Sequence, residues 1–266
     1  MLVAPSDVLK FQQDGIVLLR DMLETHALDD LSTALEENLR SPGPWANEYA
    51  AEEQKGRFFD DYVNWSRFDA YKTLALNGAL PQIALALMGI TTGRFFHEHV
   101  LVKEPGTNRI TPWHHDDPYY GIDSTINVSL WVPLDHVPES IALRAIKGSH
   151  KWDARYVPRR FVDESPYVAE AKGFEALPDA AILDASSDIA TFAAKPGDIV
   201  AFHFRTLHSA PATTSHASRR RVISFRYVDS DAVWATRPWR TSPPLDANSL
   251  RDGDVIDDER FPLVTS

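Results

Sequence analysis

The pattern of apolar residues changes near residue 95, and this change constrains the fold more than any other feature. Before it, leucines recur at three-to-four spacing, as in the segment from Glu24 to Arg40, which is typical of an amphipathic helix. After it, β-branched and aromatic residues form short runs separated by Pro, Gly and Asp clusters, which is typical of strands. Many short strands after a helical start indicate a mainly β fold, either an antiparallel barrel or a double-sheet jelly roll, with flanking helices.

The same patterns place individual elements along the chain. Helices are expected over residues 6–14, 24–40, 68–76 and 81–88. Strands are expected over residues 16–20, 96–103, 126–134, 199–204 and 221–228. The stretch 152–195 is ambiguous and is expected to hold a long insertion between strands. We therefore expect one domain over residues 1–266, with a helical part to about residue 90, a jelly-roll core over about 91–230 and a C-terminal extension.

Composition excludes several classes of partner and cofactor. The formal net charge is -11 and the acidic residues are spread along the chain, which disfavours nucleic acid and anionic membrane surfaces. A small-molecule substrate is the better expectation. The chain has no cysteine, so disulfides, iron–sulfur clusters and thiolate zinc sites are excluded, and any metal must be bound by His and carboxylate. No signal-like N-terminus and no membrane-length apolar stretch is present, which predicts a cytoplasmic protein.

Ligand-type side chains are concentrated in the segment Thr111-Pro112-Trp113-His114-His115-Asp116-Asp117-Pro118. Its two prolines prevent a long helix, so we expect a strand end that continues into a loop. In an extended backbone, residues two apart project to the same side. His114 and Asp116 can therefore reach one ion, while His115 points away; His115 and Asp117 form the same pattern shifted by one residue.

A third ligand must come from elsewhere, and two histidines of the segment 197–209 are candidates. His203 lies inside an apolar strand, whereas His208 lies where that strand gives way to a polar run, and we favour His208. Two imidazoles and one carboxylate on one face of an ion, with other positions open, are typical of non-haem iron(II) oxygenases. The H-x-D triplet alone is weak evidence, because the chain contains ten histidines.

An arginine cluster follows, at residues 219–221, at the start of an expected strand. A guanidinium inside a barrel is costly unless it meets an anion, and its planar fork matches a carboxylate. A dicarboxylate co-substrate would need such a group. For at least two of the three arginines, the simpler interpretation is that the side chains lie at a solvent-exposed edge.

These residues together resemble the phytanoyl-CoA dioxygenase family of 2-oxoglutarate-dependent oxygenases. The resemblance covers most of the chain and includes several short motifs: F-Q-Q-D-G-I-V at 11–17, W-H-x-D at 113–116, S-L-W-V-P-L at 129–134, G-S-H at 148–150, G-D at 197–198, the distal His208, and R-x-x-x-S at 220–224.

The resemblance implies a double-stranded β-helix, the cupin-like jelly roll. It implies that His114, Asp116 and His208 are the catalytic metal ligands for Fe(II), with 2-oxoglutarate as co-substrate and O2 as oxidant. It also implies that Arg220 pairs with the distal carboxylate of 2-oxoglutarate, with Arg219 as the fallback. Ser129 is expected to be an additional hydrogen-bond donor to the co-substrate.

The expected activity is that of a dioxygenase which hydroxylates an aliphatic C–H bond of a small molecule and releases succinate and CO2. Related halogenases carry a small residue in place of the carboxylate, so Asp116 favours hydroxylation or desaturation over halogenation. Tyr119, Tyr120 and Trp131 are either pocket walls or ordinary core aromatics.

One alternative function is that of a non-catalytic or isomerase-like metal-binding jelly roll. Another is a metal-dependent phosphohydrolase, which the adjacent His115 and Asp116 suggest. Neither the substrate nor the oligomeric state can be read from the sequence.

Overall fold

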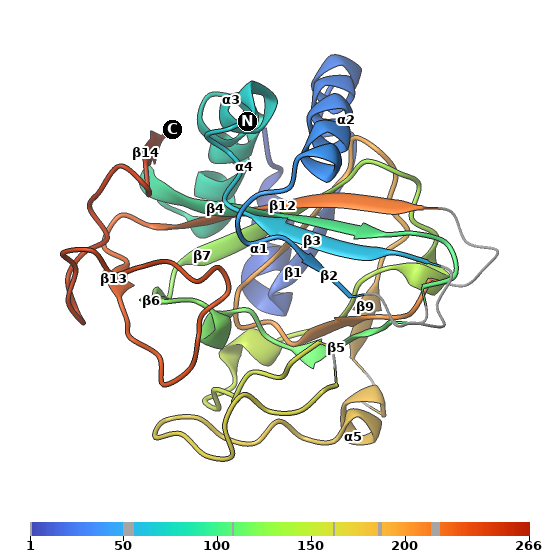
Figure 1. The fold of residues 1–266 in the computed structure, drawn as a ribbon. Helices are drawn as coiled ribbons and strands as arrows, with labels where there is room; N and C mark the ends of the chain where they lie inside the picture. The colour runs from blue at the N-terminus through green and yellow to red at the C-terminus, as the bar shows by residue number, and fades with distance from the viewer. Residues whose placement is uncertain (1, 50–55, 108, 162, 186–187, 214–218) are drawn as a thin grey trace.

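The computed structural model describes residues 2–49, 56–107, 109–161, 163–185, 188–213 and 219–266. Two antiparallel sheets lie one above the other, and helices cover the outer face of the larger sheet (Figure 1). This is the mainly β, double-stranded β-helix fold expected from the sequence.

The larger sheet has the strand order β1-β10-β7-β12-β4-β3-β2, and β14 also pairs with β4. Its strands are β1 (Ile16–Leu19), β2 (Asn47–Glu48), β3 (Phe58–Tyr62), β4 (Thr92–Lys103), β7 (Asn127–Pro133), β10 (Ile199–Phe202), β12 (Arg220–Asp229) and β14 (Leu263–Thr265). All predicted strands occur here, within a few residues of their expected ends.

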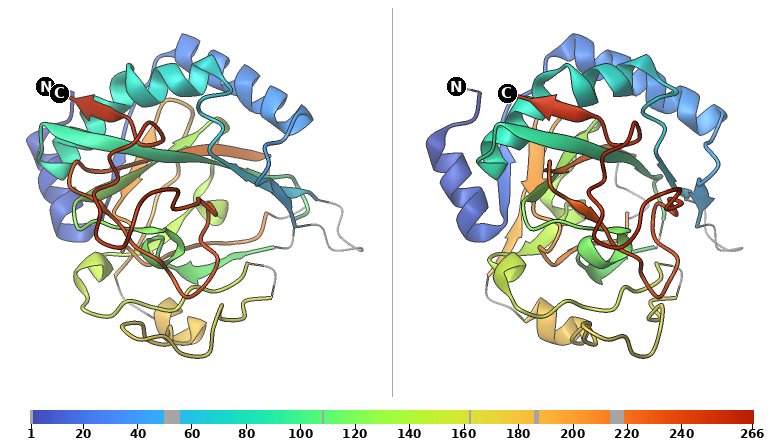
Figure 2. Two further views of the ribbon diagram at one scale, coloured as in Figure 1. Left: turned by 60° about the vertical axis from the view of Figure 1, so that its left-hand side comes forward. Right: turned by 90° about the vertical axis from the view of Figure 1, so that its left-hand side faces the viewer.

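The smaller sheet has the order β5-β11-β8-β9, and a separate pair joins β13 to β6. The strands are β5 (Thr111–His114), β6 (Ile122–Asp123), β8 (Arg144–Ile146), β9 (Ile189–Thr191), β11 (His208–Ala210) and β13 (Val233–Trp234). Short helical turns η1 (Asp117–Tyr119), η2 (Glu139–Ile141) and η3 (Ser149–Lys151) connect them. The expected insertion is mostly loop, with α5 (Ala180–Asp184) on the side of the molecule far from the other helices (Figure 2).

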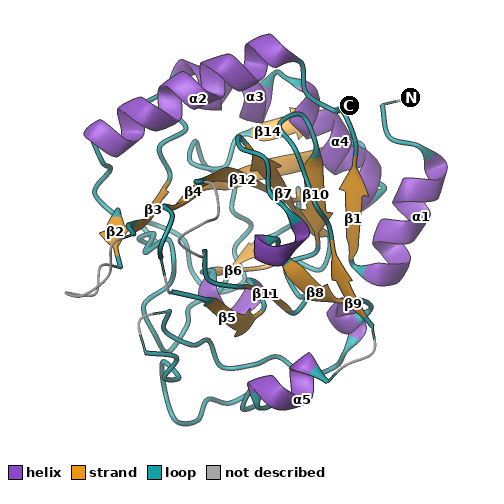
Figure 3. Cartoon of the chain, turned by 90° about the vertical axis from the view of Figure 1, so that its right-hand side faces the viewer, coloured by secondary structure: helices purple, strands orange, loops and turns teal. Residues whose placement is uncertain are grey.

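The four predicted helices are present as α1 (Pro5–Asp14), α2 (Thr25–Arg40), α3 (Asp69–Leu76) and α4 (Ala79–Met88). Gly15 and Gly89 end α1 and α4 in the left-handed conformation, with φ of 73° and 71°, which favours glycine. Figure 3 shows α2, α3 and α4 over the larger sheet and α1 beside β1. Among the described residues, no helix is long and apolar enough to cross a membrane.

Strand alternation separates a packed face of the larger sheet from a functional face. Along β12, Phe225 and Tyr227 belong to the apolar core beneath the helices. Arg220, Ser224 and Arg226 face the opposite way and line a cavity between the two sheets. Because side chains alternate with a period of two, one strand supplies both the main core and a polar wall.

Strands β2 and β3 lie in the part of the chain that we expected to be helical, and they were not predicted. In β3, every residue is buried, including Asp60 and Asp61. Two consecutive acidic residues conceal the alternation that identifies a half-buried strand. Their carboxylates are instead satisfied by hydrogen bonds, for example from Asn47 and Tyr49 to Asp60.

Candidate metal centre

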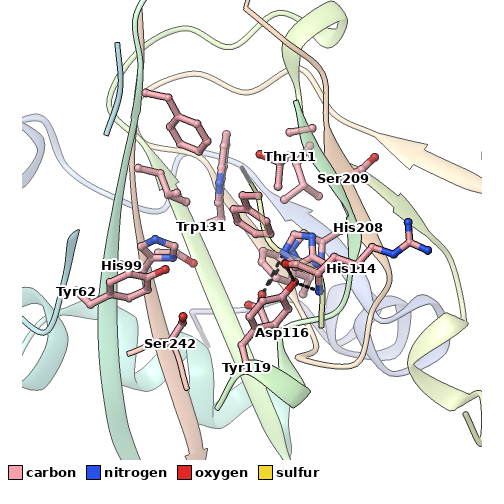
Figure 4. Close-up of a pocket in the computed structure, with 18 of the residues that line it drawn as sticks. Tyr62, His99, Thr111, His114, Asp116, Tyr119, Trp131, His208, Ser209 and Ser242 are labelled. Carbon is pink, nitrogen blue, oxygen red and sulfur yellow. Dashed lines mark hydrogen bonds and ion pairs between the residues drawn. The ribbon is translucent and has the colours of Figure 1, made fainter. Parts of the chain in front are cut away.

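The smaller sheet brings His114 and His208 together. His114 is the last residue of β5, His208 is the first residue of β11, and the two are direct partners in the antiparallel register. Asp116 follows two residues after His114, where its backbone N–H donates to Phe204 O at 2.7 Å and fixes the turn. Figure 4 shows the three side chains pointing toward one another from these two segments.

The geometry suits a single metal ion. Asp116 Oδ1 lies 3.6 Å from His114 Nε2 and 3.7 Å from His208 Nε2. One ligand atom from each of the three residues lies within 4.8 Å of the other two. Three donors of this type, grouped on one side, would hold an ion and leave further coordination positions for other groups, as in the facial arrangement of non-haem iron sites.

Hydrogen bonds set the tautomer of both imidazoles. His114 Nδ1 lies 2.8 Å from Pro112 O, and His208 Nδ1 lies 2.9 Å from Thr206 O. A carbonyl only accepts, so Nδ1 carries the proton in each ring and the Nε2 lone pair is free to bind a metal ion. Burial, followed by the neighbouring His114, lowers the pKa of His208 to about 3, so this ligand is neutral at physiological pH.

The two carboxylate oxygens of Asp116 face different groups. While Oδ1 faces the imidazoles, Oδ2 accepts from Arg226 at 3.2 Å and from Ser129 at 3.4 Å. Burial alone would raise the pKa of Asp116, but Arg226 and then the two histidines outweigh it and hold the pKa well below its ordinary range. The carboxylate is therefore ionised and oriented before any metal binds.

A cavity that is partly open to solvent adjoins His114, Asp116 and His208. Aromatic side chains form much of its wall, including the predicted Tyr119, Tyr120 and Trp131. Tyr119 is held by its hydroxyl, which donates to Arg159 O at 2.6 Å and accepts from Arg159 N at 2.9 Å. In Figure 4, Thr111 and Ser209 lie on one side of the triad, and Tyr119 and Ser242 lie on the opposite side.

The three other predicted site residues have different surroundings. Arg220 lines the cavity, and burial lowers its pKa to about 10. Arg219 lies outside the cavity, where it pairs with Glu36 at 2.5 Å and Glu104 at 2.8 Å. The Ser129 hydroxyl donates to Asp116, so in this structure its proton is directed at that carboxylate and not at the cavity.

The remaining histidines of the two motifs are used elsewhere. His115 points away from the triad, as expected, and its Nε2 accepts from Tyr156 N at 3.0 Å. His203 Nδ1 accepts from Arg205 N at 3.1 Å. A phosphohydrolase site built on both His115 and Asp116 is therefore not formed by this fold.

Sequence reasoning gave no role to Arg226 and His99, which lie beside the candidate metal ligands. Arg226 contacts Asp116 and lies near His99, with the guanidinium 3.5 Å from His99 Nδ1. Lys103 lines the cavity beside Arg220. The position of Arg226 could have been predicted from the two-residue period of a strand over 220–226, which places Arg226 on the same strand face as Arg220 and Ser224.

Comparisons with known proteins agree with this architecture. A family model described as phytanoyl-CoA dioxygenase (PhyH) matches residues 11–221, whereas no match was found among curated protein sequences. The crystal structure of the non-heme alpha ketoglutarate dependent carbocyclase SnoK from nogalamycin biosynthesis is similar, with a TM-score of 0.78 and 24% identity over 99% of this chain and 97% of that chain.

Two further solved structures share the fold at lower identity. One is the epimerase SnoN in complex with Fe3+, alpha ketoglutarate and nogalamycin RO, with a TM-score of 0.77 and 22% identity over 97% of each chain. The other is EctD from S. alaskensis with 2-oxoglutarate and 5-hydroxyectoine, with a TM-score of 0.66 and 17% identity over 95% of this chain and 85% of that chain.

Proposed function

Since the chain belongs to the phytanoyl-CoA dioxygenase family, we propose that it is an iron(II)- and 2-oxoglutarate-dependent dioxygenase that oxidises a C–H bond of a small molecule. The observation that carries the proposal is the convergence of the buried side chains His114, Asp116 and His208 on one point beside a cavity that is partly open to solvent. The donor set fits ferrous iron, since it offers two neutral imidazoles and one ionised carboxylate and leaves positions free.

When bound, iron(II) and 2-oxoglutarate supply activation of dioxygen, and the co-substrate is converted to succinate and CO2. The protein's residues prepare the site for that chemistry. Arg220 offers a buried guanidinium to the distal carboxylate of the co-substrate, and Arg226 fixes the orientation of Asp116. The aromatic walls at Tyr119 and Tyr120 exclude water and hold an apolar substrate against the open side of the triad.

We assign hydroxylation of an aliphatic C–H bond as the reaction outcome. The carboxylate ligand Asp116 is retained, which supports oxygen transfer over halogenation. The printed names of similar structures include a carbocyclase and an epimerase. The product therefore has to be measured directly, because hydroxylation adds one oxygen atom, ring closure or desaturation removes two hydrogen atoms, and epimerisation leaves the mass unchanged.

The test is conversion of 2-oxoglutarate by the full chain reconstituted with iron(II) under nitrogen and then exposed to air. We expect succinate above background, increased by a true substrate, and none without iron or oxygen. Asp116→Ala should abolish it, whereas His115→Gln, which alters the neighbouring imidazole turned away from the triad, should retain it. Succinate formation by Asp116→Ala at the wild-type rate would refute the proposal, as would no succinate with any substrate tried. The second result is the one that a non-catalytic metal-binding jelly roll predicts.

A further inference from the structure

Two cations lie opposite each other at one end of the cavity. Lys103, at the end of β4, and Arg220, at the start of β12, are direct partners in the antiparallel register. Both side chains are buried, with Lys103 only 1% and Arg220 only 6% exposed, and both line the cavity. Like charges placed directly opposite on one face of a sheet destabilise it, and burial increases the cost.

Neither cation has a carboxylate partner within the described ranges of the chain. Lys103 Nζ donates to Arg109 O at 2.9 Å and to Thr111 Oγ1 at 3.1 Å, and Arg220 donates to Ile141 O. The adjacent Arg221, on the other face of the strand, pairs with Asp135 at 2.7 Å. The cavity-facing cations therefore retain charge and donor capacity that an incoming anion would satisfy.

The surroundings suit a carboxylate in particular. Ser224, on the same strand face as Arg220 and separated from it there by Val222, has a buried hydroxyl with no hydrogen-bond partner among the described residues. Thr111 adds a second hydroxyl beside Lys103. Trp131 and Phe202, which also line the cavity, are apolar surfaces suited to methylene groups. Two cations and the Thr111 hydroxyl lie at one end, and the candidate metal ligands lie further along β5. The Ser224 hydroxyl lies between these groups in sequence terms, four residues along β12 from Arg220, so the arrangement matches a diacid with one coordinating end.

We propose that Lys103 is a second cation, beside Arg220, for the distal carboxylate of the dicarboxylate co-substrate, and that it determines selectivity for diacids over monoacids. This inference rests on the proposed function. Arg220 contributes the planar fork, whereas Lys103 contributes a point charge from the neighbouring strand. Two groups on different strands restrict the carboxylate more tightly than one, so a keto acid without a distal carboxylate should gain nothing from Lys103.

The test is equilibrium binding of two keto acids, 2-oxoglutarate and the monoacid 2-oxobutyrate, to the full chain. The protein is loaded with Mn(II) so that no turnover occurs. We expect Lys103→Met to weaken 2-oxoglutarate binding by roughly 10- to 100-fold, the range for a hydrogen bond between charged groups. Binding of 2-oxobutyrate should stay within a few-fold of wild type. Lys72→Met, which alters an exposed lysine of α3, is the matched control and should change neither affinity.

Two further variants of Lys103 keep the inference testable if the methionine variant does not fold. Lys103→Gln retains hydrogen bonding without charge and should reduce the diacid preference to what Arg220 alone supports, while Lys103→Arg retains charge and should keep most of the wild-type preference. If the Met or Gln variant bound 2-oxoglutarate with wild-type affinity, this inference would be overturned but the proposed function would not. An equal loss of affinity for both keto acids would have the same consequence. Failure of the wild-type protein to bind 2-oxoglutarate would overturn the inference and the proposed function together.

Discussion

Replacing Arg220 by alanine tests whether this buried guanidinium binds the co-substrate. Arg220 is 6% exposed, lines the cavity and has no ion pair within the described part of the chain, so its charge is available to a carboxylate. A bidentate contact would make two charge-assisted hydrogen bonds of roughly 1.5–3 kcal/mol each. Because Lys103 remains and water fills part of the space, we expect a loss of about 3 kcal/mol. That loss corresponds to an increase of roughly 150-fold in the required 2-oxoglutarate concentration.

The assay measures succinate formation against 2-oxoglutarate concentration, with metal content determined on the same preparations. Arg220→Ala should raise the KM for 2-oxoglutarate while binding iron normally, because the triad does not contact Arg220 in the described structure. Arg219→Ala is the matched control, since Arg219 pairs with Glu36 and Glu104 outside the cavity. A normal KM in Arg220→Ala together with a raised KM in Arg219→Ala would refute the assignment.

Three other perturbations follow from the site. Arg226→Met should weaken Mn(II) binding by about 10- to 100-fold in a chelator competition, because Asp116 loses its orienting partner. Arg221→Met, which alters an arginine paired with Asp135, should leave Mn(II) binding unchanged. Equal affinities of both variants for Mn(II) would contradict the role of Arg226. Burial, then Arg205, lowers the pKa of His115 to about 3, so the folded state resists a proton that the unfolded state accepts. The free energy of unfolding, measured in urea, should therefore have its full value above about pH 6.5 and should decrease by up to about 1.4 kcal/mol for each pH unit below that. His115→Gln should reduce this slope; an unchanged slope would show that His115 is not the cause. Burial, then Arg220, lowers the pKa of Lys103, whereas a bound carboxylate would raise that pKa. Calorimetry should therefore show that the affinity for 2-oxoglutarate weakens as the pH rises from the pKa of Lys103 in the free protein to its pKa in the complex. An affinity that does not depend on pH would argue against this linkage.

Periodicity made much of the fold predictable. The leucines of α2 and the glycine that ends α1 gave clear helical limits, and β4, β7, β10 and β12 were found from β-branched and aromatic runs. The spacing of His114 and Asp116 predicted that both face one point, and the structure places His208 with them. These features are local, so the sequence carries them directly.

Features that depend on strand register were not predictable from one sequence. The cross-strand pairing of Lys103 with Arg220 depends on how β4 aligns with β12, and no local pattern specifies that alignment. Ser129 was expected to be an additional hydrogen-bond donor to the co-substrate; in the structure it lies opposite Arg226 in the register, and its hydroxyl donates to Asp116. Strand β3 was missed because buried acidic residues interrupt its apolar pattern.

The central claim is that three side chains hold one ferrous ion. The most direct measurement is anomalous X-ray scattering at the iron edge from crystals grown anaerobically with iron(II) and 2-oxoglutarate. We predict a single strong peak bonded to His114 Nε2, Asp116 Oδ1 and His208 Nε2. An iron peak at any other set of residues, or none in crystals that diffract well, would contradict it.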